Sequence, residues 1–323
     1  MNPTAKAFWI AEPGRGELRT ENLPPVNDNQ VLVRTRFSAV SRGTESLVFN
    51  GRVPASEYQR MRAPFQSGDF PAPVKYGYAC VGEIEEGSEQ LRGQTVFCLH
   101  PHQDRFVVPA DAVVPIPHSV PANRAILAAT METALNGLWD SQAGPGDRIS
   151  VVGGGMVGAL IAWLAGRLPG ADVTLIDILP QRAALARHLG VAFALPDQAS
   201  SDQDRVFHTS ASEAGLATAL RLAGEEARII EMSWYGQQQP RLSLGEAFHA
   251  RRLTLQSSQV GRIPPARAPR WDFRRRLAKA IDLLADPTLD ALISGESRFE
   301  QLPAIMPQLA DARADVLCHR ICY

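Results

Sequence analysis

The sequence predicts an α/β protein in which a β-rich part is interrupted by a doubly wound parallel sheet. Three observations predict this arrangement: short strand-like runs fill about residues 3–120, strands and helices alternate over about residues 148–258, and a last strand follows two helices. A chain of 323 residues exceeds one typical domain. We expect a first domain over residues 1–122, an inserted domain over residues 123–266, and a return of residues 267–323 to the first domain.

Strand-like runs rich in Val, Ile, Thr and Phe dominate the first part of the chain. Gly, Pro and Asn separate these runs, which is typical of short strands joined by turns. Near residue 121 the apolar residues adopt helical spacing, and GPGD (144–147) then predicts a turn into the next strand. The expected strands are AKAFWIAE (5–12), QVLVRTRFSAV (30–40), ACVGEIEEG (79–87), QTVFCLHP (94–101) and RFVVPADAVVPIP (105–117).

The alternation after residue 148 predicts a parallel sheet with helices on both faces. Residues 149–166 lack charge and are long enough for a short membrane helix, but they start with β-branched residues and break at three consecutive glycines. We therefore interpret them as strand, turn and helix. The expected strands start near residues 148, 172, 204, 227 and 252, and the expected helices cover 156–168, 180–190, 213–224, 273–285 and 300–310.

Charge and cysteine content disfavour several classes of function. Lys and Arg number 33 and Asp and Glu number 34, so the formal net charge is −1, and nucleic acid and anionic membranes are not expected partners. The N-terminus lacks the basic start and apolar core of a signal peptide. The 4 cysteines are too scattered for a disulfide framework, and VLCHRICY (316–323) is interpreted as a closing strand rather than a metal site. These features predict a cytoplasmic protein.

A glycine-rich pattern follows the first strand of the alternating region. Gly153, Gly155 and Gly158 fit GxGxxG between the apolar run ISVV and a helix, where glycines permit a tight turn and the close approach of a pyrophosphate. Asp177 ends the next strand, where a carboxylate can accept hydrogen bonds from ribose hydroxyls and repel a 2′-phosphate. This pattern predicts NAD(H) in preference to NADP(H), although Arg182 can either pack on the adenine or approach a 2′-phosphate. The other residues expected at the cofactor are Met156, Val157, Ser210 and Ser258.

The order of the predicted domains and two short motifs resemble the medium-chain dehydrogenase/reductase superfamily, the relatives of zinc alcohol dehydrogenases. The motifs are SRGTE (41–45) and GYACVG (77–82), and they look most similar to the subgroup that includes the bacteriochlorophyllide hydroxyethyl dehydrogenase. The resemblance covers essentially the whole chain. It implies a GroES-like catalytic domain around an inserted Rossmann domain, an oxidoreductase activity on a small-molecule substrate, and a homodimer formed across the edge strand RLTLQSS (252–258).

The positions that hold catalytic zinc in the metal-dependent members carry other residues here. By the resemblance, Arg42 replaces the cysteine of a C-G-T-D motif, Tyr78 replaces the histidine of a G-H-E motif, and Glu132 matches the third position. Thr44 matches the hydroxyl that relays the alcohol proton. One carboxylate beside an arginine and a phenol does not hold zinc, and a register shift to Ser41 adds no ligand. We predict no catalytic zinc and, because the four-cysteine lobe is missing, no structural zinc; we expect Arg42 and Glu132 to form a buried pair instead.

Without zinc, hydride transfer at a carbonyl carbon requires another group to stabilise the developing oxyanion. The Tyr78 phenol can donate that hydrogen bond, with Lys75 or Arg42 lowering its pKa, or it can fill the volume left by the metal. His100 and His102 form an HxH pattern that can bind a metal, present an acid to the substrate, or serve in packing.

The segment between the two motifs, residues 46–76, is rich in arginine and aromatic residues. It can form a lid that recognises an anionic or aromatic substrate, or a solvated helix with a Pro-rich return. Three functions stay open: an NAD(H)-dependent, zinc-independent oxidoreductase acting on a secondary alcohol or ketone, an NADPH-dependent quinone or enoyl reductase, and a nucleotide-binding redox sensor without turnover. We favour the first, because Asp177 disfavours NADPH.

Overall fold

The computed structural model describes residues 3–311 and 313–323, which divide into two compact units. The first unit combines residues 3–129 with 277–323, and the second comprises residues 130–276. The chain therefore leaves the first unit and returns to it. The divisions fall in helices α3 (Ala128–Ser141) and α7 (Phe273–Leu283), somewhat later than the expected ends at residues 122 and 266.

The first unit, which we call the β-rich unit, contains two sheets. Its strands are β1 (Thr4–Glu12), β2 (Arg15–Asn22), β3 (Gln30–Val40), β4 (Ser67–Gly68), β5 (Val74–Lys75), β6 (Cys80–Glu86), β7 (Thr95–Cys98), β8 (Arg105–Pro109), β9 (Val113–Pro115), β16 (Ile293–Arg298) and β17 (Cys318–Cys322). Its helices and helical turns are α1 (Arg42–Phe49), η1 (Ala55–Glu57), η2 (Ala110–Ala112), α2 (Ala122–Ala125), η4 (Pro287–Leu292), η5 (Phe299–Gln301) and α8 (Leu302–Leu309). The strand orders are β2-β1-β5-β4 and β16-β17-β3-β6-β7-β9, with β8 paired to β3.

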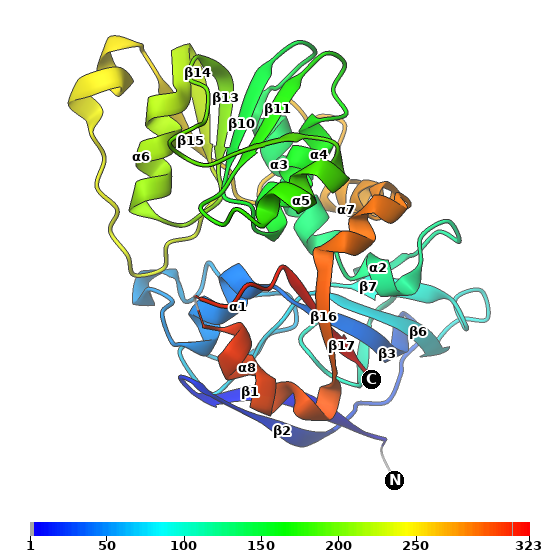
Figure 1. Ribbon diagram of the computed structural model, residues 1–323. Coiled ribbons are helices and arrows are strands. Elements are labelled where there is room, and N and C mark those ends of the chain that lie inside the picture. Colours follow the sequence, from blue (N-terminus) through cyan, green and yellow to red (C-terminus); the bar gives the residue numbers. More distant parts are fainter. Residues whose placement is uncertain (1–2, 312) are drawn as a thin grey trace. The chain divides into compact units, whose positions relative to one another are not determined.

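The C-terminal strand completes a sheet that the N-terminal part of the chain begins. Strand β17 pairs with β16 in parallel and with β3 in antiparallel orientation (Figure 1). The interpretation of VLCHRICY as a closing strand is therefore confirmed. The Cys318 thiol is buried within this sheet, and burial raises its pKa to about 12.

The glycines of GYACVG allow close approach of neighbouring segments. A Cβ atom on Gly82 would lie 2.4 Å from the carbonyl oxygen of Arg34 on β3. Gly77 has a φ of +124°, which disfavours other residues, and a Cβ atom there would lie 2.9 Å from Cδ2 of His102. Tyr78 thus lies between a turn that requires glycine and the start of strand β6.

The second unit is built on one parallel sheet. Its strands are β10 (Arg148–Val152), β11 (Asp172–Ile176), β12 (Ala192–Ala194), β13 (Gln203–His208), β14 (Ala223–Glu231) and β15 (Thr254–Ser257), and its helices are α4 (Met156–Ala165), α5 (Arg182–Leu189), α6 (Glu213–Leu222) and the π-type turn η3 (Leu244–Phe248). The order is β12-β11-β10-β13-β14-β15, and neighbouring strands run parallel. This is the doubly wound Rossmann order, whose direction reverses between β10 and β13. We call it the Rossmann unit; α4, α5 and α6 lie against its sheet in Figure 1.

Residues 50–76 contain little regular secondary structure. After α1 the segment contains only the short turn η1 and the two-residue strands β4 and β5, so a solvated helix is wrong. Arg60 pairs with Glu57 at 3.0 Å, and Arg62 pairs with Asp69. Lys75 is buried, with Nζ 2.7 Å from an oxygen of Glu21 and 2.9 Å from Oε1 of Gln103. The lid stays a prediction.

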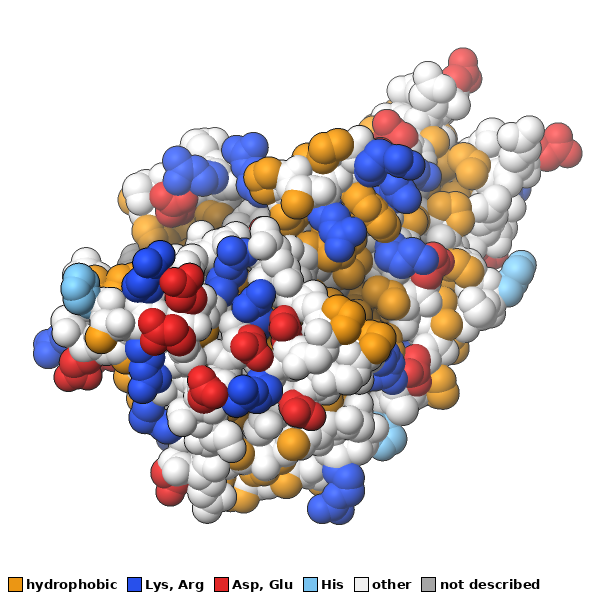
Figure 2. Space-filling model, turned by 90° about the horizontal axis from the view of Figure 1, so that it is seen from above, with side chains coloured by type: hydrophobic (Ala, Val, Ile, Leu, Met, Phe, Trp, Pro, Cys, Tyr) orange, Lys and Arg blue, Asp and Glu red, His pale blue; other side chains and the backbone are white. Residues whose placement is uncertain are grey.

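The surface shown in Figure 2 carries basic and acidic side chains that are interspersed rather than gathered by sign. This pattern agrees with the near-zero net charge of −1. Within the described part of the chain, no helix combines the length and the apolar character that crossing a membrane requires.

Candidate functional site

The glycine loop of the Rossmann unit has the geometry of a dinucleotide-binding turn. Gly153 follows β10 with a φ of +112°, and a Cβ atom on it would lie 2.7 Å from Oγ1 of Thr209. A Cβ atom on Gly158 would lie 1.9 Å from the carbonyl oxygen of Gly153, so helix α4 can approach β10 only with glycine there. A Cβ atom on Gly155 would meet no atom within 4 Å, which leaves open space at the N-terminus of α4. The three glycines therefore allow the turn and the close helix packing, and they leave open space that a phosphate could enter.

Asp177 fixes this loop through its carboxylate. One oxygen, Oδ2, accepts a hydrogen bond of 2.6 Å from the amide of Gly154, and the other, Oδ1, accepts one of 2.9 Å from the amide of Leu179. A carboxylate has about four acceptor positions, so both oxygens can still accept from ribose hydroxyls. The stem of Arg182 packs over the same loop, because a Cβ atom on Gly154 would lie 3.3 Å from its Cγ. The sequence-predicted residues Gly153, Gly155, Gly158, Asp177 and Arg182 thus come together, and Met156 and Val157 form the first turn of α4.

Two serines predicted at the cofactor follow strands β13 and β15 of the same sheet, which are separated by β14. Ser210 follows β13 and is exposed, and its backbone nitrogen would lie 2.8 Å from a Cβ atom on Gly153. Ser258 follows the edge strand β15, and its hydroxyl donates to Oδ2 of Asp140 at 2.7 Å. Ser210 therefore borders the glycine loop, whereas the hydroxyl of Ser258 is engaged with a carboxylate on α3.

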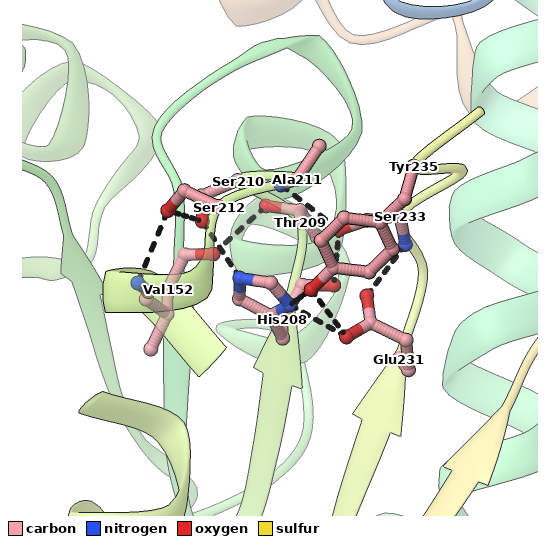
Figure 3. Close-up of polar contacts among 10 residues, drawn as sticks. Val152, His208, Thr209, Ser210, Ala211, Ser212, Glu231, Ser233 and Tyr235 are labelled. Carbon is pink, nitrogen blue, oxygen red and sulfur yellow. Dashed lines mark hydrogen bonds and ion pairs between the residues drawn. The ribbon is translucent and has the colours of Figure 1, made fainter. Parts of the chain in front are cut away.

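A buried polar cluster behind Ser210 was missed by the sequence analysis. His208 lies 2.7 Å from Ser210 through Nε2 and 2.7 Å from Glu231 through Nδ1 (Figure 3). The Tyr235 hydroxyl donates to the same Glu231 oxygen at 3.2 Å. Burial, followed by the charge of Glu231, raises the pKa of Tyr235, so the phenol stays protonated.

Glu132 pairs with an arginine of its own unit, and the expected pair with Arg42 of the β-rich unit stays a prediction. Its carboxylate accepts a hydrogen bond of 3.0 Å from Nε of Arg276, and both side chains are almost fully buried, at 6% and 2% exposure. Arg276 also donates to Oδ1 of Asn136 and to the backbone oxygens of Val260 and Arg262. Burial raises the pKa of Glu132, although the guanidinium acts in the opposite direction. The cation that neutralises Glu132 within its unit is therefore Arg276.

In the β-rich unit, Arg42, Thr44 and Tyr78 lie around the start of α1. Arg42 donates to the backbone oxygen of Asp311 at 3.1 Å. The Tyr78 hydroxyl donates to Oγ of Ser41 at 2.6 Å and also contacts Thr44. Burial and then the charge of Glu45 raise the pKa of Tyr78 to about 12, while the bonds to Ser41 and Thr44 act the other way.

The expectation that Lys75 or Arg42 lowers the pKa of Tyr78 is therefore wrong. Lys75 is committed to Glu21 and Gln103, and the nearest charge that affects the phenol is negative. Tyr78 stays neutral near pH 7 and acts as a hydrogen-bond donor, not as a base.

The two histidines of LHPHQD have different environments. His100 stacks on Phe106 at 3.8 Å and on Phe65 at 5.6 Å between ring centroids, and burial lowers its pKa to about 3. It is neutral at physiological pH, so the assignment of His100 as a catalytic acid is wrong and its role is packing. His102 is buried, with Nε2 2.8 Å from Glu45 and Nδ1 2.7 Å from Ser38.

The residues at the three family positions do not fit zinc. Arg42 is a cation, Tyr78 is a neutral phenol, and Glu132 is neutralised by Arg276. Zinc in proteins takes thiolate, imidazole or carboxylate ligands, usually four in number. Over residues 3–311 and 313–323, no group of three or more His, Cys, Asp or Glu side chains could hold a metal ion.

Comparison with known proteins agrees with this fold. No family model matches the chain. An uncharacterised zinc-type alcohol dehydrogenase-like protein of Haemophilus influenzae is 23% identical over 346 aligned positions that cover 96% of each chain. D-guloside 3-dehydrogenase of Escherichia coli K12 is 24% identical over 315 positions, covering 88% of this chain and 89% of its own.

Two solved structures share the architecture across the whole chain. L-idonate 5-dehydrogenase of Escherichia coli K-12 gives a TM-score of 0.82 at 14% identity, covering 100% of this chain and 99% of its own. A protein of Sinorhizobium meliloti 1021, described as a zinc-binding dehydrogenase and bound to NADP, gives a TM-score of 0.79 at 16% identity, covering 100% of both chains. The chain has the α/β fold of the medium-chain alcohol dehydrogenases, and the relatives and structural neighbours named above are described as dehydrogenases or as dehydrogenase-like.

Proposed function

We propose that this protein is an NAD(H)-dependent oxidoreductase that transfers a hydride between the nicotinamide ring and a secondary alcohol or the corresponding ketone. The observation that carries the proposal is the glycine loop at the switch point between β10 and β13, with Asp177 beside it. The relatives support the class of substrate, since D-guloside 3-dehydrogenase and L-idonate 5-dehydrogenase are named for hydroxyl-rich substrates. A sugar or polyol alcohol is therefore the first class to test.

The preference for NAD(H) rests on the charge of Asp177. Its carboxylate lies at the end of β11, where the ribose of the adenosine half binds in this fold, and a 2′-phosphate there would meet a like charge. The NADP bound by the Sinorhizobium relative makes the opposite preference the natural competitor. A substitution that removes the charge, Asp177→Ser, should therefore reduce the difference in affinity between NADH and NADPH.

The proposal includes catalysis without zinc. Tyr78 and Thr44 supply hydroxyl groups at the start of α1, and the raised pKa of Tyr78, about 12, keeps its phenol protonated. With substrate bound, the phenol hydrogen that Ser41 accepts in this structure would turn to the oxygen on which negative charge develops, which is the task a Lewis acid performs in metal enzymes. Bound NAD(H) would accept or supply the hydride. In alcohol oxidation the hydroxyl proton would pass through the Thr44 hydroxyl to solvent, while Tyr78 holds the oxygen that becomes the ketone.

The test is a substrate panel with matched variants. Purified protein is incubated with NAD or NADP and a set of secondary alcohols, sugars and polyols, and NADH formation is followed by absorbance. We expect turnover of a hydroxyl-rich substrate with NAD, a fall of roughly 10²-fold or more in kcat for Tyr78→Phe, and near-parental activity for Tyr323→Phe, which removes a hydroxyl that contacts Ser38. Consumption of an enone with NADPH, or tight NADH binding without turnover of any compound, would contradict the proposal.

A further inference from the structure

Four polar side chains form a chain of hydrogen bonds that runs from the interior of the Rossmann unit to its surface. His208, at the end of β13, is 0% exposed, and Ser210, two residues later, is exposed. Glu231 ends the neighbouring strand β14, directly opposite His208 in the parallel register. The contacts are 2.7 Å from Glu231 to Nδ1 of His208, 2.7 Å from its Nε2 to Oγ of Ser210, and 2.9 Å from there to Oγ of Ser212 (Figure 3).

The donors around Glu231 set the direction of these hydrogen bonds. The amide of Ser233 donates to Oε1 at 2.8 Å, and the Tyr235 hydroxyl donates to Oε2 at 3.2 Å. A carboxylate that collects such donors only accepts, so Nδ1 of His208 carries the hydrogen and Nε2 is left as an acceptor in the neutral ring. The hydrogen of Ser210 is therefore donated inward to Nε2. Ser212 must then donate its hydrogen to Ser210 across their 2.9 Å contact, so the oxygen of Ser210 offers one remaining lone pair, and no hydrogen, to a ligand.

Helix α6 has a glycine, Gly215, beside the contact between Ser210 and His208. A Cβ atom on Gly215 would lie 2.1 Å from Oγ of Ser210 and 2.8 Å from Nε2 of His208. Glycine is a poor helix former, yet Gly215 lies in the first turn of α6, and any other side chain would displace the contact. Ser212 caps the same helix by accepting from the amide of Gly215 at 3.0 Å. The absence of a side chain at Gly215 is thus what allows the hydroxyl of Ser210 to reach His208.

Ser210 and Asp177 lie on opposite sides of the switch point, because Ser210 follows β13 and Asp177 follows β11. Ser210 borders Gly153, whose carbonyl oxygen accepts from Oγ1 of Thr209 at 2.8 Å. Asp177 follows β11 and serves the half of the crevice where the adenosine ribose binds in this fold. Ser210 follows β13, so it faces the other half of a dinucleotide bound across the crevice.

We propose that Ser210 accepts a hydrogen bond from a hydroxyl of the second ribose, the one that carries nicotinamide, and that His208 and Glu231 are positioning residues that fix this polarity. The inference rests on the proposed function. A sugar hydroxyl is the matching ligand because it donates, whereas an anionic phosphate would meet the remaining lone pair of Ser210. The groups that face His208 are Glu231 from β14, Tyr235 from the following loop, Ser210 after β13 and Gly215 from α6.

A series of shortened ligands tests the proposal. ADP lacks the second ribose, ADP-ribose contains it, and NADH adds the nicotinamide; the dissociation constant of each is measured by calorimetry. For Ser210→Ala we expect roughly three- to tenfold weaker binding of ADP-ribose and NADH, with ADP unchanged. Ser210→Thr, which keeps the hydroxyl, should bind all three like the parent. Ser201→Ala, an exposed serine before β13 at the opposite end of the strand, is the matched control.

A second variant tests the positioning role. Asparagine at residue 208 can still donate to Glu231 but has no group in place of Nε2, so His208→Asn should show the same ligand-selective loss. The double variant with Ser210→Ala should lose no more than either single variant, because both act through one hydroxyl. Equal weakening of ADP, ADP-ribose and NADH, or fully additive losses, would overturn the inference while leaving the proposed function intact. Failure of the parent to bind any of the three would overturn both.

Discussion

Each unit of this protein contains a buried histidine hydrogen-bonded to a glutamate, but only one of the two pairs leads to an exposed hydroxyl. In the β-rich unit, His102 and Glu45 lie 2.8 Å apart with side-chain exposures of 1% and 5%. The other nitrogen of His102 contacts Ser38, which contacts the hydroxyl of Tyr323 at 3.0 Å. This chain of contacts stays inside the unit.

In the Rossmann unit, His208 and Glu231 lie 2.7 Å apart with side-chain exposures of 0% and 14%. The other nitrogen of His208 contacts the exposed Ser210 beside the glycine loop. The same pair of residue types thus has two uses. Where the hydrogen-bond partners of the histidine are both buried, as at His102, the enclosed pair stabilises the fold. Where the chain of contacts reaches an exposed side chain, as at His208, the open pair orients a hydroxyl group.

The largest expected effect separates the enclosed pair from the open one. Glu45→Ala removes the acceptor of both His102 and the backbone amide of Ser41, deep in the β-rich unit. We expect a loss of about 3 to 5 kcal/mol in the free energy of unfolding, because a buried pair is broken without replacement by water. Urea unfolding measures it, with Glu57→Ala on the surface as the control. A variant as stable as the parent would show that this pair does not hold the unit together.

Substitution of Glu231 in the open pair should destabilise the protein less than substitution of Glu45, but it should weaken the binding of NADH more. Glu231→Gln keeps the shape of the side chain but weakens three hydrogen bonds. We therefore expect the free energy of unfolding to fall by about 1.5 to 3 kcal/mol and NADH to bind severalfold more weakly. Glu45→Gln, the matched change in the enclosed pair, should leave NADH affinity unchanged. The comparison fails if both glutamine variants bind NADH equally well.

A third histidine sharpens the comparison because aromatic rings, and no carboxylate, surround its imidazole. The pKa of His100 is lowered to about 3 from an ordinary value of 6.5, so between these pH values the unfolded chain binds a proton that the folded protein does not. The free energy of unfolding should therefore fall as pH falls from 6.5 to 3. The slope of this free energy against pH corresponds to the uptake of up to about one proton on unfolding. His100→Phe should remove this slope and change stability little at pH 7. Unfolding measured across this pH range checks it, and an unchanged slope in the variant would contradict the assignment.

The elements of the fold and the glycine loop could be predicted from the sequence because their signals are local. Strand runs, the GxGxxG spacing and the acidic end of β11 each occupy a few consecutive residues, and the structure confirms them. The partner of Glu132 could not be predicted in this way. Arg276 is 144 residues away in the chain, and many other arginines were equally possible.

The His208 cluster could have been found from the sequence. His208 and Glu231 each end a strand, and in-register alignment of two consecutive parallel strands places them opposite each other. This signal lies in the pairing of the two strands, and neither strand carries it alone. The raised pKa of Tyr78 could not be predicted from sequence neighbours, because Lys75 is near Tyr78 in the chain but pairs with Glu21.

The central claim is a zinc-free, NAD(H)-dependent site, and metal analysis combined with cofactor titration tests it most directly. Protein purified without chelator, with and without added zinc, is analysed for metal and titrated with NADH and NADPH. The account predicts less than about a tenth of an equivalent of zinc and tighter binding of NADH than of NADPH. Close to one equivalent of tightly held zinc would contradict it, and so would a preference for NADPH.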